Sequence, residues 1–308
     1  MFGSTDSRAP RRALLSTALA VTVALATLAC GSDDAPALTI GAGDSTQSTL
    51  LAEIYAGALA RTGARTAVRA GLGARPAQLA ALDADTAIAV ADVTGDLLTA
   101  LDSTSRARTP DDVNKALNGA LPEGLTVGDP ADGTDLRPAV VAAATTELPS
   151  SLKDLAPLCP GLTIGIATGP ALDPMHAPLD PERDVIAPLR SVYGCAVTRT
   201  VPFSTSEEAR KALSTGEIQL AVLSGPVAYL SDGGADLTAL ADPAYVFRAA
   251  MVLPIVRKSA LTDVQLRKLN YVAGELTTTD LADMLRQLRD NHADPADLAR
   301  TWLDAHAL

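Results

Sequence analysis

The sequence has few aromatic residues, few histidines and no excess of positive charge, and each shortage removes a class of function. Aromatic residues make up 3% of the 308 residues, although cation-binding cages and base-stacking platforms are built from aromatic faces. The formal net charge of −11 excludes nucleic-acid binding, because neutralising phosphates needs clustered lysine and arginine. Three histidines without ligand spacing give little support to a metal site. The hydrophobic fraction of 47% is sufficient for the cores of a globular protein.

The N-terminus has the pattern of an export signal. Three arginines within residues 8–12 precede an uncharged, mostly apolar run over residues 13–29, which is a charged region followed by a short hydrophobic one. The run ends at Cys30, with Ala29 before it and polar residues after it, and this resembles the lipobox at which bacterial lipoproteins are acylated and cut. The sequence therefore predicts a signal peptide over residues 1–29, lipidation of Cys30 and a polar linker over residues 30–37.

Two other outcomes remain open at this N-terminus. Thr27 stands where the commonest lipobox has leucine, and Leu28 directly precedes Ala29. Ordinary secretion and a simple membrane anchor are the alternatives to lipidation. The uncharged run of roughly 17 residues is at the lower limit for a helix that spans a bilayer.

The mature chain would keep two cysteines, Cys159 and Cys195. An exported protein meets an oxidising environment, where an even pair of cysteines usually forms a bridge. We therefore predict one disulfide, with two separately buried free thiols as the alternative. On the chain-entropy model, closing a loop of about 36 residues stabilises the fold by roughly 3 to 4 kcal/mol.

Strands and helices alternate along the chain, which predicts parallel sheets covered by helices. The expected strands cover residues 38–41, 66–69, 86–93, 139–144, 162–166, 197–201, 218–223 and 249–256. The expected helices cover residues 50–59, 78–82, 152–155, 188–193, 206–213, 263–274, 279–291 and 295–305. The alternation starts again after Arg137, which predicts a second α/β lobe.

The loop between the first strand and the first helix is a candidate ligand contact. Asp44, Ser45 and Thr46 come directly before the helix, where free backbone N–H groups and the positive end of the helix dipole suit a ligand carboxylate. In open α/β sheets, ligands bind beyond the carboxyl ends of the strands and commonly between lobes. We therefore expect the glycines and hydroxyls at the strand ends to line a cleft.

Short motifs spread over residues 38–303 together resemble one known family. They are Thr39–Gly41, Glu53–Tyr55, Gly71–Gly73, Val93–Gly95, Val192–Cys195, Gly216–Ile218, Leu253–Lys258 and Leu276–Leu281. Their order and spacing are similar to those of the osmoprotectant-type substrate-binding proteins of ABC importers, whose ligands include glycine betaine, choline, carnitine and proline betaine. Similar members also have a cysteine pair like Cys159 and Cys195.

The resemblance implies a two-lobed Venus-flytrap, the type II periplasmic-binding-protein fold, with a mainly parallel α/β sheet in each lobe. Lobe one would comprise residues 38–136 and 245–308, and lobe two residues 137–244, with two crossing segments as the hinge. The resemblance also implies a small polar solute as ligand and an ABC permease and ATPase as partners. It places the chain, lipid-anchored, on the outer face of the cytoplasmic membrane.

The departures from the family fall on its ligand site. Where the family usually has Ser-Lys-Asn-Phe-Thr-Glu, residues 42–47 read Ala-Gly-Asp-Ser-Thr-Gln, so Gly43 replaces the lysine. Where the family often has Tyr-Pro-Glu-Tyr-Thr-Gly, both tyrosines are replaced, by Val90 and Val93. The usual Thr-Thr-Asp of lobe two is replaced by Ser-Gly-Pro at residues 224–226. Because a trimethylammonium group needs several aromatic faces, a standard betaine cage is expected to be absent.

Seven side chains are predicted to line the cleft, and they are Asp44, Ser45, Thr46, Asp92, Thr94, Thr168 and Ser224. Each also has a structural alternative. Hydroxyl residues at a helix start commonly serve as N-caps, and Asp92 is either a partner for a ligand cation or a solvated loop acid. Tyr193 is expected in the core, whereas Tyr229 and Tyr245 remain candidates for a cage.

Three classes of function remain to be compared. The sequence gives little support for an enzyme. Ser224 and Gly225 do not form a nucleophile elbow, and no histidine is paired with an acidic residue. The carboxylates also lack the spacing that general acid–base catalysis requires. We therefore expect a binding protein without catalytic residues or a cofactor. The alternative is a degenerate family member that binds no small molecule and acts through protein contacts in the envelope. The loss of three site motifs supports this alternative.

Overall fold

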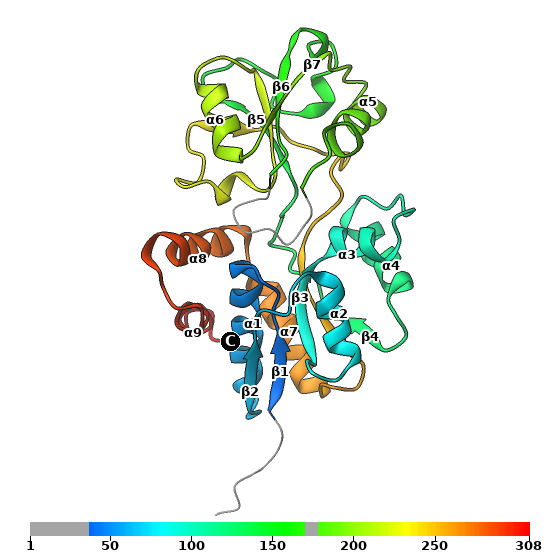
Figure 1. The fold of residues 1–308 in the computed structure, drawn as a ribbon, viewed down its shortest axis with the longest axis vertical. Helices are drawn as coiled ribbons and strands as arrows, with labels where there is room; N and C mark the ends of the chain where they lie inside the picture. The colour runs from blue at the N-terminus through cyan, green and yellow to red at the C-terminus, as the bar shows by residue number, and fades with distance from the viewer. Residues whose placement is uncertain (1–36, 170–177) are drawn as a thin grey trace, which may run out of the picture. The chain divides into compact units, whose positions relative to one another are not determined.

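The computed structural model describes residues 37–169 and 178–308. The predicted signal peptide, the predicted lipidation site Cys30 and the linker up to residue 36 lie outside the described residues. Within the described ranges, no helix has both the length and the apolar character that a bilayer span requires. The described elements form two sheets, each flanked by its own helices (Figure 1).

The first sheet takes four strands from the N-terminal part of the chain and one from the C-terminal part. These strands are β1 (Leu38–Gly41), β2 (Thr66–Arg69), β3 (Ala89–Val93), β4 (Leu125–Val127) and β10 (Val252–Arg257). Their order is β2-β1-β3-β10-β4, with β1 parallel to β2 and β3, and β10 antiparallel to β3 and β4. Every residue of β3 is buried, as expected of a central strand that is covered on both faces.

The helices of this lobe come from both ends of the chain. They are α1 (Thr46–Ala60), α2 (Arg75–Asp83), α3 (Thr94–Leu101), α4 (Pro110–Ala120), α7 (Asp263–Glu275), α8 (Thr278–Asn291) and α9 (Pro295–Ala305). Ten of the fifteen residues of α1 are buried, and the helix packs against α7 and α9. The C-terminal helices therefore complete the core around the N-terminal strands. Trp302 of α9, the one tryptophan of the sequence, is buried in this core.

The second sheet repeats the arrangement of the first. Its strands are β5 (Ala139–Ala143), β6 (Thr163–Ala167), β7 (Arg199–Phe203), β8 (Leu220–Leu223) and β9 (Leu237–Ala239), in the order β7-β6-β8-β5-β9. β6 is parallel to β7 and β8, whereas β5 is antiparallel to β8 and β9. The accompanying helices are α5 (Ala187–Tyr193) and α6 (Ser206–Ser214), with short helical segments η1 (Leu152–Asp154), η2 (Cys159–Gly161), η3 (Pro181–Ile186) and η4 (Val227–Tyr229).

In each sheet the one reversed strand stands fourth in the order, and it is the first strand after the chain crosses from the other sheet. β5 follows the crossing from β4, and β10 follows the return from β9. Four strands of each sheet therefore share one direction, in agreement with the predicted mainly parallel sheets. The strands of the two sheets fall within the ranges predicted for lobe one and lobe two, and we keep these names for the two halves.

One carboxylate ties the two crossing segments together. Asp242, before the return crossing, forms an ion pair at 3.2 Å with Arg137 of the first crossing. Asp242 also accepts hydrogen bonds from the backbone N–H groups of Val246 (2.8 Å) and Phe247 (3.1 Å) and from the hydroxyl of Tyr193 (2.6 Å). Burial and the bond to Asp242 raise the pKa of Tyr193 to about 12.

The Arg137 guanidinium also lies 4.4 Å from the centre of the Tyr245 ring. The candidate cage residue Tyr245 therefore already faces a cation of the protein itself. The predicted core position of Tyr193 is only partly correct, since its ring packs at the margin of the lobe-two core while its hydroxyl bonds Asp242.

The structure differs from the sequence prediction mainly next to strand ends. The predicted strand over residues 86–93 begins at Ala89, and the helix α3 follows β3 directly at Thr94, without a loop. The predicted helix at residues 152–155 is a single 3-10 turn, and prolines at 157 and 160 disfavour its continuation. β7 begins at Arg199, two residues later than predicted. The helices α3 and α4 and the short strands β4 and β9 were not predicted.

Candidate functional site

The loop before α1 is held mainly by hydrogen bonds within the protein. Ser45 is the N-cap of α1, with its Oγ accepting from Ser48 N at 3.0 Å, while Ser48 Oγ accepts from Gly43 N at 2.8 Å. Asp44 Oδ1 accepts from Gly73 N at 3.1 Å and stays exposed, as does Thr46. Of the three predicted contacts in this loop, Ser45 thus has the capping role, and Asp44 and Thr46 remain open to solvent.

The loss of the family's lysine has a steric reason in this chain. A Cβ atom added at Gly43 would lie 2.8 Å from the carbonyl oxygen of Gly73 and 2.5 Å from Nε2 of Gln78. Backbone of the neighbouring loop therefore fills the space that a side chain at this position would need. Gly43 fits the local packing, and a lysine would displace the loop that contains Gly73.

A hydrogen bond joins the predicted ligand loops of the two lobes. The hydroxyl of Tyr229, in η4 of lobe two, donates to Oε1 of Gln47 in the first turn of α1 at 2.8 Å. Both residues are buried, although Gln47 is polar. Sequence reasoning did not select Gln47 as a site residue. Gln47 is a polar residue in the first turn of α1, and its burial became visible only in the structure.

Asp92 is neutralised inside lobe one. Its two carboxylate oxygens accept from Nε and Nη2 of Arg75, each at 2.7 Å, and Oδ1 also accepts from Val93 N. Burial alone would lower the pKa of Arg75, but the hydrogen bond and charge of Asp92 outweigh it, so that pKa is raised. The interpretation of Asp92 as a solvated loop acid is therefore wrong, and its role as partner of a ligand cation remains a prediction that the ion pair weakens.

The hydroxyl of Thr94 forms hydrogen bonds with backbone groups just before β10. Thr94 Oγ1 donates to Ala249 O and accepts from Met251 N, both at 3.1 Å, and the residue is fully buried. The adjacent Gly95 is required by close backbone approach, because a Cβ there would lie 2.4 Å from Ala249 O. Thr94 thus joins β3 to the return crossing.

The two predicted lobe-two hydroxyls are also hydrogen bonded within the protein. Thr168 Oγ1 donates to Phe203 O at 3.1 Å. The buried Ser224 shares a hydrogen bond of 3.2 Å with Ser206 Oγ, at the start of α6. Thr168 and Ser224 lie just after β6 and β8, two neighbouring parallel strands, so their loops occupy the same edge of the second sheet.

The positions of the two missing tyrosines belong to the core. Val90 and Val93 are buried in β3 and pack into two different clusters of lobe one. Neither valine lines either of the pockets described next. These two positions therefore contribute no aromatic face to a ligand cage.

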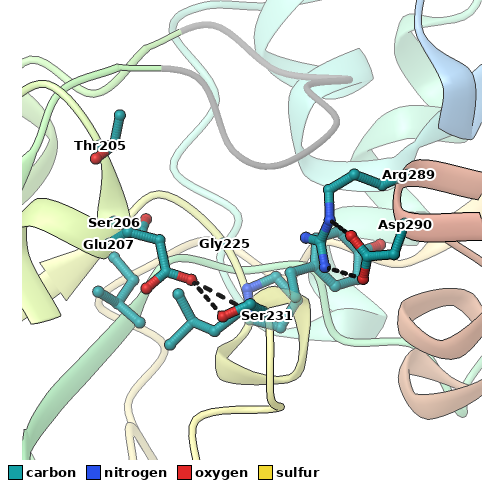
Figure 2. Close-up of a pocket in the computed structure, with 11 residues that line it drawn as sticks. Thr205, Ser206, Glu207, Gly225, Ser231, Arg289 and Asp290 are labelled. Atoms are coloured by element: carbon teal, nitrogen blue, oxygen red, sulfur yellow. Dashed lines mark hydrogen bonds and ion pairs between the residues drawn. The ribbon is translucent and has the colours of Figure 1, made fainter. Parts of the chain in front are cut away.

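The first pocket, which we call the α8 pocket, has a volume of about 630 Å³ and takes residues from both lobes. Figure 2 shows Arg289 and Asp290 of α8 on one side and Glu207 and Ser231 of lobe two on the other. Leu223, Pro226, Tyr229 and Leu230 add an apolar surface. The pocket lies beside Ser224, since residues 223, 225 and 226 line it while the Ser224 side chain turns toward Ser206.

The charges of the α8 pocket are largely paired within each wall. Arg289 binds both oxygens of Asp290 at 2.6 and 2.8 Å, and Glu207 Oε1 accepts from the backbone N and the hydroxyl of Ser231. The hydrogen bond with Arg289 holds the pKa of Asp290 below its usual value. The pocket therefore offers a polar rim around an apolar wall, which suits a small amphipathic or polar solute.

The second pocket, which we call the crossover pocket, has a volume of about 520 Å³. Its walls come from the start of α3, from both crossing segments and from the region around η3 in lobe two. It contains Arg108 and Arg248 of lobe one and Arg183 of lobe two, together with Asp96 and Asp184. Both pockets thus have residues from both lobes, and neither is confined to one sheet.

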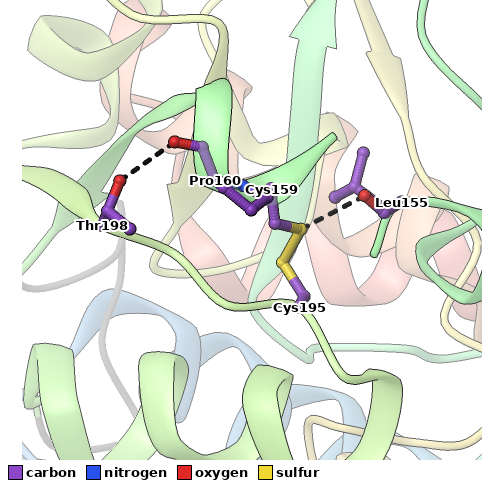
Figure 3. Close-up of a disulfide and its surroundings, with 5 residues drawn as sticks. All are labelled: Leu155, Cys159, Pro160, Cys195 and Thr198. Carbon is purple, nitrogen blue, oxygen red and sulfur yellow. Dashed lines mark hydrogen bonds between the residues drawn. A yellow bond between two sulfur atoms is a disulfide. The ribbon is translucent and has the colours of Figure 1, made fainter. Parts of the chain in front are cut away.

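The predicted disulfide is present in lobe two. Cys159 and Cys195 are bonded with their Cα atoms 5.4 Å apart, and both are fully buried (Figure 3). The bond joins η2 to the segment after α5, and Thr198 Oγ1 donates to Pro160 O at 3.0 Å beside it. The alternative of two free thiols is therefore wrong for this structure. Among the residues described, no group of three or more His, Cys, Asp or Glu side chains is arranged to hold a metal ion.

Comparison with known proteins points to solute-binding proteins. A family model described as the substrate binding domain of an ABC-type glycine betaine transport system matches residues 187–305. No curated protein sequence matches the chain. The crystal structure of a glycine betaine/carnitine/choline ABC transporter has a TM-score of 0.71 at 16% identity, covering 88% of this chain and 98% of that chain.

Two further solved structures have the same architecture. Apo YehZ from Escherichia coli has a TM-score of 0.69 at 18% identity, covering 88% of this chain and 99% of that one. Lactococcal OpuAC, closed and complexed with glycine betaine, has a TM-score of 0.51 at 13% identity, covering 88% and 96%. At these identities the structural likeness establishes the fold. The family match and the fold together confirm the predicted resemblance and the two-lobed α/β fold class.

Proposed function

We propose that this chain is the extracytoplasmic solute-binding protein of an ABC importer. The observation that carries the proposal is the match of residues 187–305 to the substrate binding domain of a glycine betaine transport system. The matched segment runs from the start of α5 to the end of α9 and so includes parts of both lobes. In such a protein the lobes close on a solute and present the closed form to a permease and ATPase, which are the proposed partners.

The proposed ligand is a small polar solute. The two pockets have volumes of about 630 and 520 Å³, in the range of small-molecule sites, and each combines apolar walls with a few charged groups. The structural relatives include proteins named for glycine betaine, carnitine and choline. Because Val90 and Val93 are core residues here, we infer that the ligand does not depend on an aromatic cage at these positions.

We also propose that the mature chain begins at a lipidated Cys30 and is held on the outer face of the cytoplasmic membrane. The support is the charged region, apolar run and small residue before Cys30 in the sequence. An anchored position would keep the protein close to its permease.

A second candidate function is favoured by one specific observation. Asp92, Thr94, Thr168 and Ser224 all have hydrogen-bond partners within the protein. A member of the fold that has lost its solute and acts through protein contacts in the envelope would have the same pattern.

Equilibrium binding separates the two candidates. The mature protein, unfolded and refolded to remove any carried solute, is titrated calorimetrically with a panel of amino acids, betaines, polyamines, small sugars and organic acids. Saturable binding of one solute at a stoichiometry near one, unchanged in the surface variant Arg300→Gln, supports the importer function. A folded protein that binds no member of the panel supports the second candidate.

A further inference from the structure

Two arginines of the crossover pocket form no ion pair with a carboxylate among the described residues, although Asp96 and Asp102 lie close enough to Arg248 to act on its charge. Arg108 lies in the loop before α4, and Arg248 lies in the return crossing. Their backbones are neighbours, since Ala249 N donates to Arg108 O at 2.8 Å. Both side chains are partly buried. Two guanidinium groups thus share one wall of the pocket in a protein whose net charge is −11.

Backbone and hydroxyl oxygens hold these guanidinium groups in place. Arg248 donates from Nε to Ala107 O at 2.9 Å, from Nη1 to Thr99 Oγ1 at 2.7 Å and from Nη2 to Ser105 O at 2.5 Å. Arg108 donates from Nη1 to the carbonyl oxygens of Tyr245 and Val246. A guanidinium has five N–H donors, so each arginine keeps donors for which the described residues provide no acceptor.

The two positive charges also repel each other. Partial burial and the charge of Arg108 lower the pKa of Arg248, against the opposing influence of Asp96 and Asp102. Like charges in a partly desolvated pocket destabilise the folded state, and an anion placed between them relieves this repulsion. Arginine is well suited to the task, because its planar fork matches the two oxygens of a carboxylate.

The opposite wall of the pocket belongs to lobe two. Pro178, Leu179 and Pro188 lie there, close to the exposed Arg183, which is paired with Asp184 at 2.7 Å. The apolar ring of Phe247, from the return crossing, also lines the pocket. A solute in this pocket would therefore contact lobe one, lobe two and the hinge at the same time.

We propose that the crossover pocket binds an anionic group of the solute, with Arg108 and Arg248 as its paired donors. This inference rests on the proposed function as a solute-binding protein and specifies the class of ligand, which is a small organic anion or a solute with a carboxylate. Because Pro178, Leu179 and Arg183 of lobe two also line the pocket, a solute whose anionic group is held by the two lobe-one arginines stabilises the arrangement of the lobes in which the pocket is formed.

The test compares carboxylates with their neutral amides. The refolded mature protein is titrated calorimetrically with acetate, lactate and succinate and with acetamide, lactamide and succinamide at constant ionic strength. We expect at least one carboxylate to bind and its amide to bind at least about tenfold more weakly. Arg108→Gln and Arg248→Gln should each weaken the carboxylate at least about tenfold, and Arg248→Lys should give an intermediate loss because it keeps the charge without the fork.

Two further variants control for folding and for nonspecific charge. Arg300→Gln, on the exposed side of α9, removes one positive charge far from the pocket wall and should leave carboxylate affinity unchanged. Arg183→Gln removes an exposed charge of the pocket without touching the hydrogen bonds of Arg248, so it tests the proposal even where Arg248→Gln fails to fold. A loss of about twofold to threefold is expected for Arg183→Gln, since exposed charges are screened.

Three results would overturn the proposal: no carboxylate binds, the amides bind equally well, or the affinity of a bound carboxylate is the same in all four pocket variants. A neutral or cationic solute that binds the wild type and all four pocket variants equally would overturn the anion site and leave the proposed solute-binding function intact. Failure of that function is seen separately, as absence of binding across the wider solute panel.

Discussion

The ion pair between Asp92 and Arg75 gives the sharpest test of whether a predicted ligand residue has a structural role. The change is Asp92→Asn, which keeps the shape of the side chain and removes its charge. In the structure the side chain of Asp92 is 7% exposed and that of Arg75 is 19% exposed. The substitution would therefore leave a largely buried guanidinium without its bidentate carboxylate.

The expected loss of stability follows from this burial. Removing one partner of a fully buried ion pair costs about 3 to 5 kcal/mol. Arg75 keeps some access to water, so we expect a loss of about 2 to 3 kcal/mol in the free energy of unfolding. For a chain of this size such a loss lowers the Tm by roughly 3 to 5 °C.

Urea unfolding followed by tryptophan fluorescence measures the loss. The single tryptophan, Trp302, is buried in the core of lobe one, the lobe that contains the ion pair. A double-mutant cycle with Arg75→Gln should give a coupling energy of about 1 to 3 kcal/mol. Asp83→Asn is the matched control, because Asp83 is exposed at the end of α2.

The opposite outcome would refute this reasoning. Asp92→Asn with wild-type stability, within about 0.5 kcal/mol, and with loss of solute binding would show that the carboxylate serves a ligand cation and that the ion pair is incidental.

Three further predictions concern the anchor, the disulfide and the ligand. Mass spectrometry of the native N-terminus should find Cys30 acylated, and Cys30→Ser should release the protein from the membrane; unchanged membrane association would contradict lipidation. Replacing Cys159 and Cys195 by serine should cost up to about 3 to 4 kcal/mol, measured by urea unfolding, and equal stability would show that packing alone fixes lobe two. Glycine betaine and choline should bind weakly or not at all in calorimetric titration, because two absent aromatic faces remove roughly 1 to 4 kcal/mol of cation recognition. Tight binding that depends on Tyr229 would show that a cage has formed elsewhere.

Local sequence signals were sufficient for most of the fold. Ser45 marks the start of α1 because its side chain caps the first turn, and the structure contains this cap. The signals failed where two elements meet without a loop, as at Val93 and Thr94, because Thr94, Gly95 and Asp96 are residue types typical of a turn, although here they begin a helix. The 3-10 turn at residues 152–154 is too short to have a periodicity of its own.

The candidate site was less predictable, because a hydroxyl or carboxylate at a strand end does not reveal its partner. Asp92 meets Arg75 from 17 positions earlier in the chain, and Thr94 meets Ala249 from 155 positions later. No short sequence pattern indicates either of these two pairings. The disulfide was predictable for the opposite reason, since two cysteines in an exported chain leave a single pairing.

The internal partners of the strand-end residues bear on how the chain recognises a solute. Asp92 and Thr94 stabilise lobe one through bonds that a ligand would have to break, so they contribute little to its specificity. We therefore expect a solute to be recognised by pocket residues whose hydrogen-bond donors have no acceptor within the described protein. In the crossover pocket these groups are Arg108 and Arg248, which lie outside every motif that resembles the family.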